Sequence, residues 1–196
     1  MDPLPPLVLE GRHVRLEPLA LAHVGALAAV GLDPAIWKWN PRPVGSLAEM
    51  RDYVQGALDE QRHGVSLPFA TVDRAGDRVV GSTRYGNVDL ANRRVEIGWT
   101  WLAPAWQRTA LNTEAKLLLL RHAFETLGCV RVELKTDALN ARSRAAIARI
   151  GATEEGILRM HMLTASGRWR DTVYFSLLDA EWPAAKAALE ERLARA

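Results

Sequence analysis

The chain has 196 residues, of which 48% are hydrophobic and 24% are charged, the balance of an ordinary globular domain. This composition excludes a disordered tail, a collagen-like repeat and a disulfide-stapled miniprotein, because the apolar fraction is high and Cys129 is the single cysteine. The net charge of +2 is too small to gather nucleic acid, so we expect no nucleic-acid partner. We expect one domain over residues 1–196.

The N-terminus and the apolar segments indicate the cellular compartment expected for the protein. Residues 1–6 carry neither the basic nor the apolar stretch of a secretory signal. The lone thiol suits a reducing compartment. The longest apolar, helix-like stretch, residues 19–32, is too short to span a bilayer. We therefore expect a cytoplasmic protein with no membrane partner.

The first third of the chain predicts a strand followed by two helices. Residues 7–16 alternate apolar and polar side chains around Gly11, which predicts two short strand pieces joined at a bulge or turn. Residues 19–30 and 46–63 have the composition and start signals of helices. Between them, three prolines and two tryptophans in residues 33–43 predict an irregular loop.

The rest of the chain predicts an antiparallel meander and then alternating helices and strands. The meander strands, separated by turn residues, are 67–72, 78–89 and 93–102. The period becomes helical from Leu111 to Gly128. The later elements are strands at 130–136, 155–163 and 169–178 and helices at 143–150 and 181–195. This order predicts a mixed α/β (α+β) fold, with a mostly antiparallel seven-stranded sheet and helices on both faces.

The helix that begins near Leu111 carries a candidate phosphate site. It follows a strand and crosses over to the next one, so its N-terminus points at a sheet edge. The first backbone N–H groups of a helix have no partner within it and attract anions. Arg108 would add positive charge beside them. The segment is equally compatible with a purely structural helix start capped by Thr or Asn.

Several short motifs share their order and spacing with one known family. They are LEGRHVRLEPL at 9–19, EIGWTWL at 96–102, TEA at 113–115, DALNARS at 137–143, IGA at 150–152 and EGILR at 155–159. With them the chain resembles the GCN5-related N-acetyltransferase (GNAT) superfamily, in its RimJ/RimL-like branch. The resemblance covers most of the chain. It implies central strands that splay apart and direct transfer of an acetyl group from acetyl-CoA to a primary amine.

The resemblance also implies which residues meet acetyl-CoA. The donor would lie where the fourth and fifth strands splay, its amides paired with strand backbone as another strand would be. The residues expected to contact it are Trp99, Thr100, Trp101, Leu102, Gln107, Arg108, Thr109, Ala110, Leu111, Asn112, Thr113, Asn140 and Ser143. An alternative reading of Asn140 is a helix N-cap, with Ser143 as a plain surface residue.

The phosphate loop departs from the family pattern. That pattern, Gln/Arg-x-x-Gly-x-Gly/Ala, places Ala110 and Asn112 on its small-residue positions. Ala110 fits if its backbone is helical and is strained if its φ is positive. Asn112 adds an amide that would cap the helix or contact phosphate.

Acetyl transfer to an amine needs a base, an oxyanion donor and a proton for the leaving thiolate. Glu96 is the candidate base, acting through water, and a backbone N–H near Trp99 or Thr100 would meet the oxyanion. Ser143 is the candidate acid by resemblance. The alternative for Glu96 is a structural pair with Arg84 or another cross-strand arginine.

His161 is a second candidate base, because histidine is a common general base and this one lies on a strand expected to border the substrate mouth. A histidine on a strand is more often structural. Cys129 follows Gly128 directly and is interpreted as a small core residue. No spacing of His, Cys and carboxylates indicates a metal site, and this reaction needs none.

The acceptor would meet an aromatic wall. Trp37, Trp39 and Tyr85 are the candidate substrate-binding residues, beside Trp99 and Trp101. Core packing is the alternative for at least half of these side chains. The resemblance favours the N-terminal amine of a protein, and a polyamine, amino acid or aminoglycoside stays open. A non-catalytic acyl-CoA sensor, a different donor and a homodimer through the C-terminal elements are further alternatives.

Overall fold

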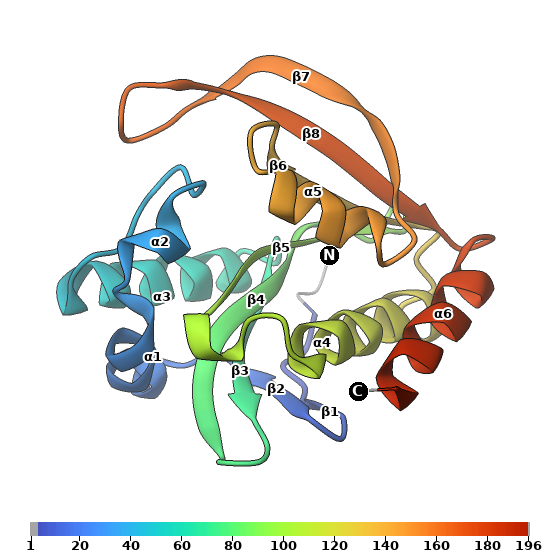
Figure 1. Cartoon of the computed structure of the whole chain (residues 1–196), viewed down its shortest axis with the longest axis horizontal. Coiled ribbons are helices and arrows are strands. Elements are labelled where there is room, and N and C mark those ends of the chain that lie inside the picture. The colour runs from blue at the N-terminus through green and yellow to red at the C-terminus, as the bar shows by residue number, and fades with distance from the viewer. Residues whose placement is uncertain (1–3, 196) are drawn as a thin grey trace.

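The structure is a computed structural model that describes residues 4–195, and it is built on one eight-stranded sheet (Figure 1). The strands are β1 Leu9–Glu10, β2 Val14–Pro18, β3 Leu67–Asp73, β4 Arg78–Asp89, β5 Arg94–Leu102, β6 Arg131–Asp137, β7 Thr153–Leu163 and β8 Trp169–Leu178. Their spatial order is β1-β2-β3-β4-β5-β6-β8-β7. All neighbours are antiparallel except β5 and β6, which confirms the predicted mixed, mostly antiparallel sheet.

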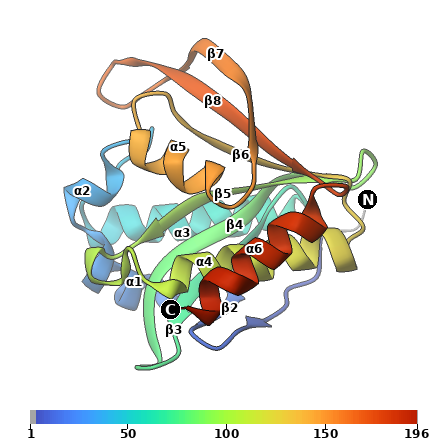
Figure 2. The same cartoon turned by 45° about the vertical axis from the view of Figure 1, so that its right-hand side comes forward.

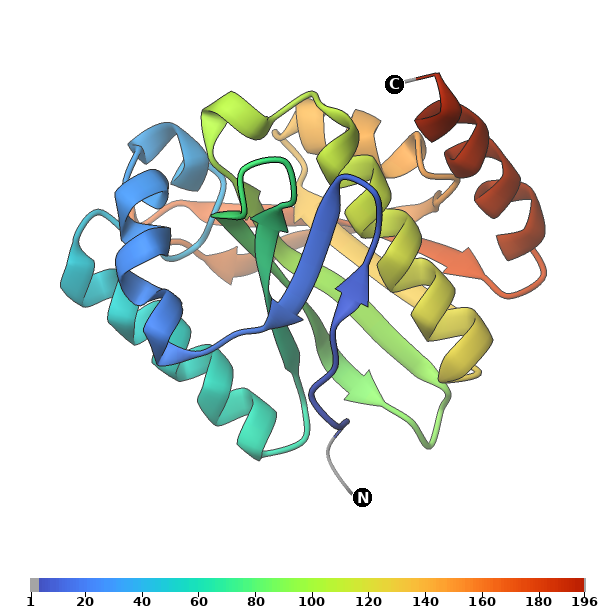
Figure 3. The same ribbon diagram turned by 90° about the horizontal axis from the view of Figure 1, so that it is seen from below.

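Helices cover both faces of this sheet, as predicted. They are α1 Val24–Gly31, α2 Pro34–Trp37, α3 Leu47–Arg62, α4 Ala110–Arg121, α5 Ala141–Ala148 and α6 Trp182–Ala194. One buried cluster joins α4, α5 and α6 to the sheet, and a second joins α1, α2 and α3 to it. Figure 3 shows these helices around the strands. Phe69 belongs to the first cluster and its neighbour Ala70 to the second. Because successive strand residues point to opposite faces, the two clusters lie on opposite sides of the sheet.

Two local predictions are wrong. The predicted turn between the two strand pieces around Gly11 is present, but the pieces pair with each other as separate antiparallel strands, β1 and β2, so the sheet has eight strands and not the seven predicted. The loop predicted over residues 33–43 contains the short helix α2, because Asp33 accepts a hydrogen bond from the Ala35 N–H at 2.9 Å and Pro34 occupies the first helical position.

The turn between β1 and β2 is held by a buried carboxylate from α4. Glu114 accepts the backbone N–H groups of Arg12, His13 and Val14 at 2.7, 2.6 and 2.8 Å. Gly11 leaves the room for it, since a Cβ at this position would collide with the carboxylate. Three N–H groups on one carboxylate reverse the chain here, which explains the extra strand. The same contacts fix α4 against the sheet edge.

The parallel pair β5 and β6 stays together for only three residue pairs. Arg94 pairs with Arg131, Val95 with Val132 and Glu96 with Glu133. Beyond this point β5 continues along β4 and β6 continues along β8, and the two strands diverge (Figure 2). The predicted splay of the central strands is therefore present.

We expect Glu114→Gln to lower the free energy of unfolding by about 2 to 4 kcal/mol, because an amide cannot accept all three N–H groups and its NH2 would face one of them. Chemical denaturation measures this loss. Glu49→Gln is the matched control, since the exposed Glu49 accepts a single backbone N–H, from Gly45, and we expect less than about 1 kcal/mol there. Equal stability of Glu114→Gln and the wild type would contradict the role of Glu114 in holding the β1–β2 turn.

Candidate active site

The divergence of β5 and β6 opens into a cleft of about 1150 Å³. The second half of β5, the loop after it, the first turn of α4, α5 and the end of α6 form its walls. Of the predicted donor contacts, the ones that line it are Trp99, Thr100, Trp101, Leu102, Gln107, Arg108, Thr109, Ala110, Asn112, Thr113, Asn140 and Ser143. Leu111 is the exception, because its side chain is buried in the core.

The loop before α4 has the geometry that its altered residues require. Ala110 is the first residue of the helix, and the positive φ in this loop, 64°, belongs to Arg108. The methyl group of Ala110 is therefore unstrained. Thr109 caps the helix, since its Oγ1 accepts the Leu111 N–H at 3.3 Å. The other N–H groups of the first turn have no acceptor within the helix, and Ala110, Asn112 and Thr113 of this turn line the cleft.

The charges that line the cleft are almost all positive. The cations are Lys38, Arg108, Lys116, Lys135, Arg142, Arg149 and Arg192, and the one lining carboxylate is that of Asp33. Within residues 4–195, Lys135 is the one member of this set with a carboxylate within 4.0 Å. Unpaired cations around a concave site favour a ligand with several negative charges.

Lys116 was not predicted as a site residue. It interrupts the apolar run of α4, is 7% exposed and lines the cleft. Its ammonium group donates to Thr100 Oγ1 at 2.8 Å, and that hydroxyl lies 2.8 Å from Thr83 Oγ1. Burial lowers the pKa of Lys116 to about 7. The sequence signal was a single charge among the leucines of this helix.

Glu96 lies at the point where the strands part, and it is 6% exposed. Its carboxylate pairs with Lys135 Nζ at 2.7 Å and accepts a hydrogen bond from Asn87 Nδ2 at 2.6 Å. Arg84 pairs instead with Glu60, so a Glu96–Arg84 pair is wrong. Lys135 also lines the cleft, and sequence reasoning missed it because it comes from the neighbouring strand.

Lys135 links Glu96 to the second candidate base. Its ammonium lies 4.7 Å from the centre of the Tyr174 ring. The Tyr174 ring packs edge-to-face against the His161 ring, with 5.8 Å between the two ring centroids. His161 Nδ1 is 3.1 Å from Thr172 Oγ1. Burial lowers the pKa of Lys135, but its hydrogen bond to Glu96 and the charge of that carboxylate outweigh this and raise the pKa. Glu96 and His161 thus lie on one face of the sheet.

Asn140 and Ser143 lie together at the start of α5. Asn140 Oδ1 accepts the Ser143 N–H at 3.1 Å, so the capping interpretation of Asn140 is confirmed. Both residues also line the cleft, which leaves the Asn140 amide nitrogen and the Ser143 hydroxyl available to a ligand.

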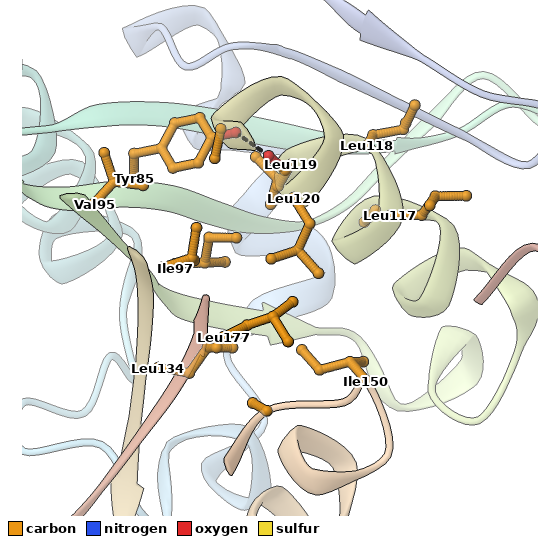
Figure 4. Packing of buried hydrophobic residues seen from close by; sticks show 14 of the residues in the cluster. Tyr85, Val95, Ile97, Leu117, Leu118, Leu119, Leu120, Leu134, Ile150 and Leu177 are labelled. Carbon is orange, nitrogen blue, oxygen red and sulfur yellow. Dashed lines mark hydrogen bonds between the residues drawn. The ribbon is translucent and has the colours of Figure 1, made fainter. Parts of the chain in front are cut away.

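The aromatic residues divide between core and cleft. Trp37 is 2% exposed and donates from Nε1 to the Gly31 carbonyl at 2.7 Å. Tyr85 is fully buried and donates to the Leu119 carbonyl (Figure 4), and burial raises its pKa. Neither Trp37 nor Tyr85 lines the cleft, so neither belongs to a candidate acceptor site there. Trp39 and Trp99 do line it, and Trp99, with a φ of 49°, bulges from β5 over the Arg84 guanidinium at 4.9 Å.

Two other features of the described residues bear on the site. Cys129 is buried, and burial raises its pKa, so it is a poor nucleophile. Among residues 4–195 no His, Cys, Asp and Glu side chains gather in a group of three or more that would hold a metal ion. In the same range no helix has the length and apolarity needed to cross a membrane.

Comparisons with known proteins agree with this geometry. A protein from Brucella melitensis described as a GCN5-related N-acetyltransferase is 36% identical, with a TM-score of 0.88 over 95% of this chain and 85% of that one. RimJ of Mycobacterium smegmatis, solved in complex with CoA-disulfide, is 27% identical, with a TM-score of 0.80 over 96% of this chain and 92% of that one. The ribosomal protein uS5-alanine N-acetyltransferase of Escherichia coli K12 is 26% identical over 65% of this chain and 66% of its own length.

A family model described as an acetyltransferase (GNAT) domain matches residues 13–153, which is more than half of the chain. The chain therefore belongs to the GNAT family and is an N-acetyltransferase.

Proposed function

We propose that this enzyme transfers the acetyl group of acetyl-CoA directly to the N-terminal α-amine of a protein. The observation that supports acetyl-CoA as the donor is that β5 and β6 stop pairing after Glu96 and Glu133. Beyond it, strand backbone borders a cleft of about 1150 Å³ whose lining charges are almost all positive, which suits a large anionic ligand. Amides of the pantetheine arm would replace the missing strand-to-strand hydrogen bonds.

The chain's own residues fit such a donor. The diphosphate would meet the first turn of α4, where N–H groups and the positive end of the helix dipole point into the cleft. Arg108 and Asn112 flank that turn. The helical backbone of Ala110 removes the objection that its methyl group would distort the loop.

Glu96 is the proposed base. The acceptor amine arrives protonated, and Glu96 would take that proton through a water molecule while Lys135 and Asn87 hold the carboxylate in place. The neutral nitrogen then attacks the carbonyl carbon and the carbon–sulfur bond breaks. A backbone N–H near Trp99 or Thr100 would meet the oxyanion, and the Ser143 hydroxyl would relay to the thiolate the second proton that the attacking nitrogen loses as the amide forms.

His161 is the weaker candidate for the base. Neither His161 nor Glu96 lines the cleft itself. The His161 side chain is exposed and bound to Thr172, whereas Glu96 is buried against Lys135, which does line the cleft. A base must come within reach of the amine directly or through one water. We therefore assign the proton to Glu96 and place His161 at the rim of the acceptor side.

The acceptor class rests on the relatives. RimJ and the uS5-alanine enzyme are similar to this chain over most of its length, and the name of the second states an alanine of a ribosomal protein as its target. Trp39 and Trp99 offer apolar contact surface in the cleft for the first residues of a peptide. A ribosomal acceptor would place the reaction in the cytoplasm.

We expect Glu96→Gln to lower kcat by about 100- to 1000-fold while the Kd for CoA changes by less than about threefold, because an amide cannot take the proton. Thiol release with peptide acceptors measures kcat, and calorimetry measures Kd. Glu133→Gln is the matched control, since Glu133 pairs with Glu96 across the ladder but binds Arg94 and Arg131. Unchanged kcat in Glu96→Gln would remove the base assignment.

We expect Asn140→Ala to weaken CoA binding by about tenfold, through loss of both the cap and the amide that faces the cleft. Asn140→Asp separates these roles, because a carboxylate keeps the cap and repels a phosphorylated ligand. We predict normal thermal stability and weaker CoA binding for Asn140→Asp. If it bound CoA as the wild type does, Asn140 would be a cap alone.

A further inference from the structure

The ammonium group of Lys116 lies in the floor of the cleft without a counter-ion. It bonds the Thr100 hydroxyl, and no carboxylate of the described residues comes within 4.0 Å of it. An ammonium removed from water without an anion raises the free energy of the folded protein. The protein limits this cost by releasing the proton, because burial brings the pKa of Lys116 down to about 7. Such a group responds strongly to any anion placed beside it.

The position of Lys116 on α4 directs it toward the proposed diphosphate site. It lies four residues after Asn112 and three after Thr113, so the three side chains share one helix face, and all of them line the cleft. Side chains on a helix lean toward its N-terminus. The Lys116 side chain is therefore directed toward the N-terminal end of α4, and its amine reaches Thr100 on β5 in the same cleft.

We propose that Lys116 is a donor-binding residue that takes up a proton when the diphosphate of an acyl-CoA enters the cleft. The inference rests on the proposed function, because it assumes that this cleft holds the donor. The diphosphate would supply the negative charge that no carboxylate of the described residues provides to Lys116. Proton and ligand then favour each other's binding by the same factor.

Most other charged groups near α4 line the cleft or are already paired, and Arg12 and His13 belong to the β1–β2 turn that Glu114 binds. The cleft contributes Arg108, Arg142, Arg149, Arg192, Lys135, Lys38 and Asp33. On the elements packed against α4, the pairs are Glu10–Arg74, Glu17–Arg15, Glu190–Arg121, Glu125–Lys186 and Glu154–Arg144. Glu114 on α4 itself faces the β1–β2 turn, and His122 follows the helix at its far end. Lys116 is thus the buried group placed to titrate with the donor.

The test is calorimetric titration with dephospho-CoA, whose diphosphate does not titrate near pH 7, unlike the 3′-phosphate monoester of CoA. At pH 7.5, in two buffers of different ionisation enthalpy, we expect uptake of about half a proton or more per ligand. The contribution of the charged Lys116 to the affinity for dephospho-CoA is complete below pH 7. It is lost as the pH rises through the pKa that Lys116 has in the complex, which the diphosphate raises. The affinity should therefore fall by about tenfold between pH 6.5 and 9.

Lys116→Met should abolish the uptake, flatten the pH dependence and weaken binding about tenfold at pH 6.5. Lys116→Arg, which stays charged, should bind without uptake. Lys186→Met, at a lysine paired with Glu125 outside the cleft, should behave as the wild type. Lys116→Arg also carries the test if Lys116→Met does not fold.

Undiminished proton uptake in Lys116→Met or Lys116→Arg would overturn the assignment while leaving donor binding intact. Binding of dephospho-CoA by the wild type with no uptake at pH 7.5 would do the same. If the wild type bound neither CoA nor dephospho-CoA, the proposed function itself would fail, which is a different result. Thermal melting of each variant confirms that it is folded.

Discussion

The molecule depends on a parallel ladder that stops early. β5 and β6 share three residue pairs and then follow different neighbours, β4 and β8. Strands that part in the middle of a sheet leave backbone groups without partners, and buried backbone groups are seldom left so. The clamp of Glu114 on the β1–β2 turn and the leucine face of α4 hold the structure around the opening. The cleft is thus a consequence of strand pairing, and a ligand with amides along its length suits it.

The charged groups differ between the α4 end of the cleft and the point where β5 and β6 diverge. At one end the first turn of α4 and a set of unpaired arginines attract anions, and at the point of divergence Glu96 is held by Lys135 and Asn87. An anionic donor and a cationic amine would therefore approach from different sides and meet where the strands separate. Lys116 is buried in the wall of this cleft, where its amine donates to the Thr100 hydroxyl.

The sequence predicts the elements well where periodicity is strong and less well where the deciding contact is distant. The bounds predicted for β4 and β8 agree with the structure, because alternation and turn residues are local signals. The division of β1 from β2 depends on Glu114, about a hundred residues away. Trp37 and Tyr85 looked like pocket residues because burial cannot be read from residue type, and Lys135 was missed because its role comes from its neighbour Glu96. Motif spacing located most of the cleft wall, since that wall is contiguous in the chain from β5 into α4.

A crystal structure of the protein with CoA would show whether the gap between β5 and β6 holds the donor. We expect the pantetheine arm between residues 97–102 of β5 and the diverging part of β6, with the diphosphate on the first turn of α4. A ladder that continues past Glu96 and Glu133 to close the gap, or a nucleotide bound elsewhere on the molecule, would contradict it.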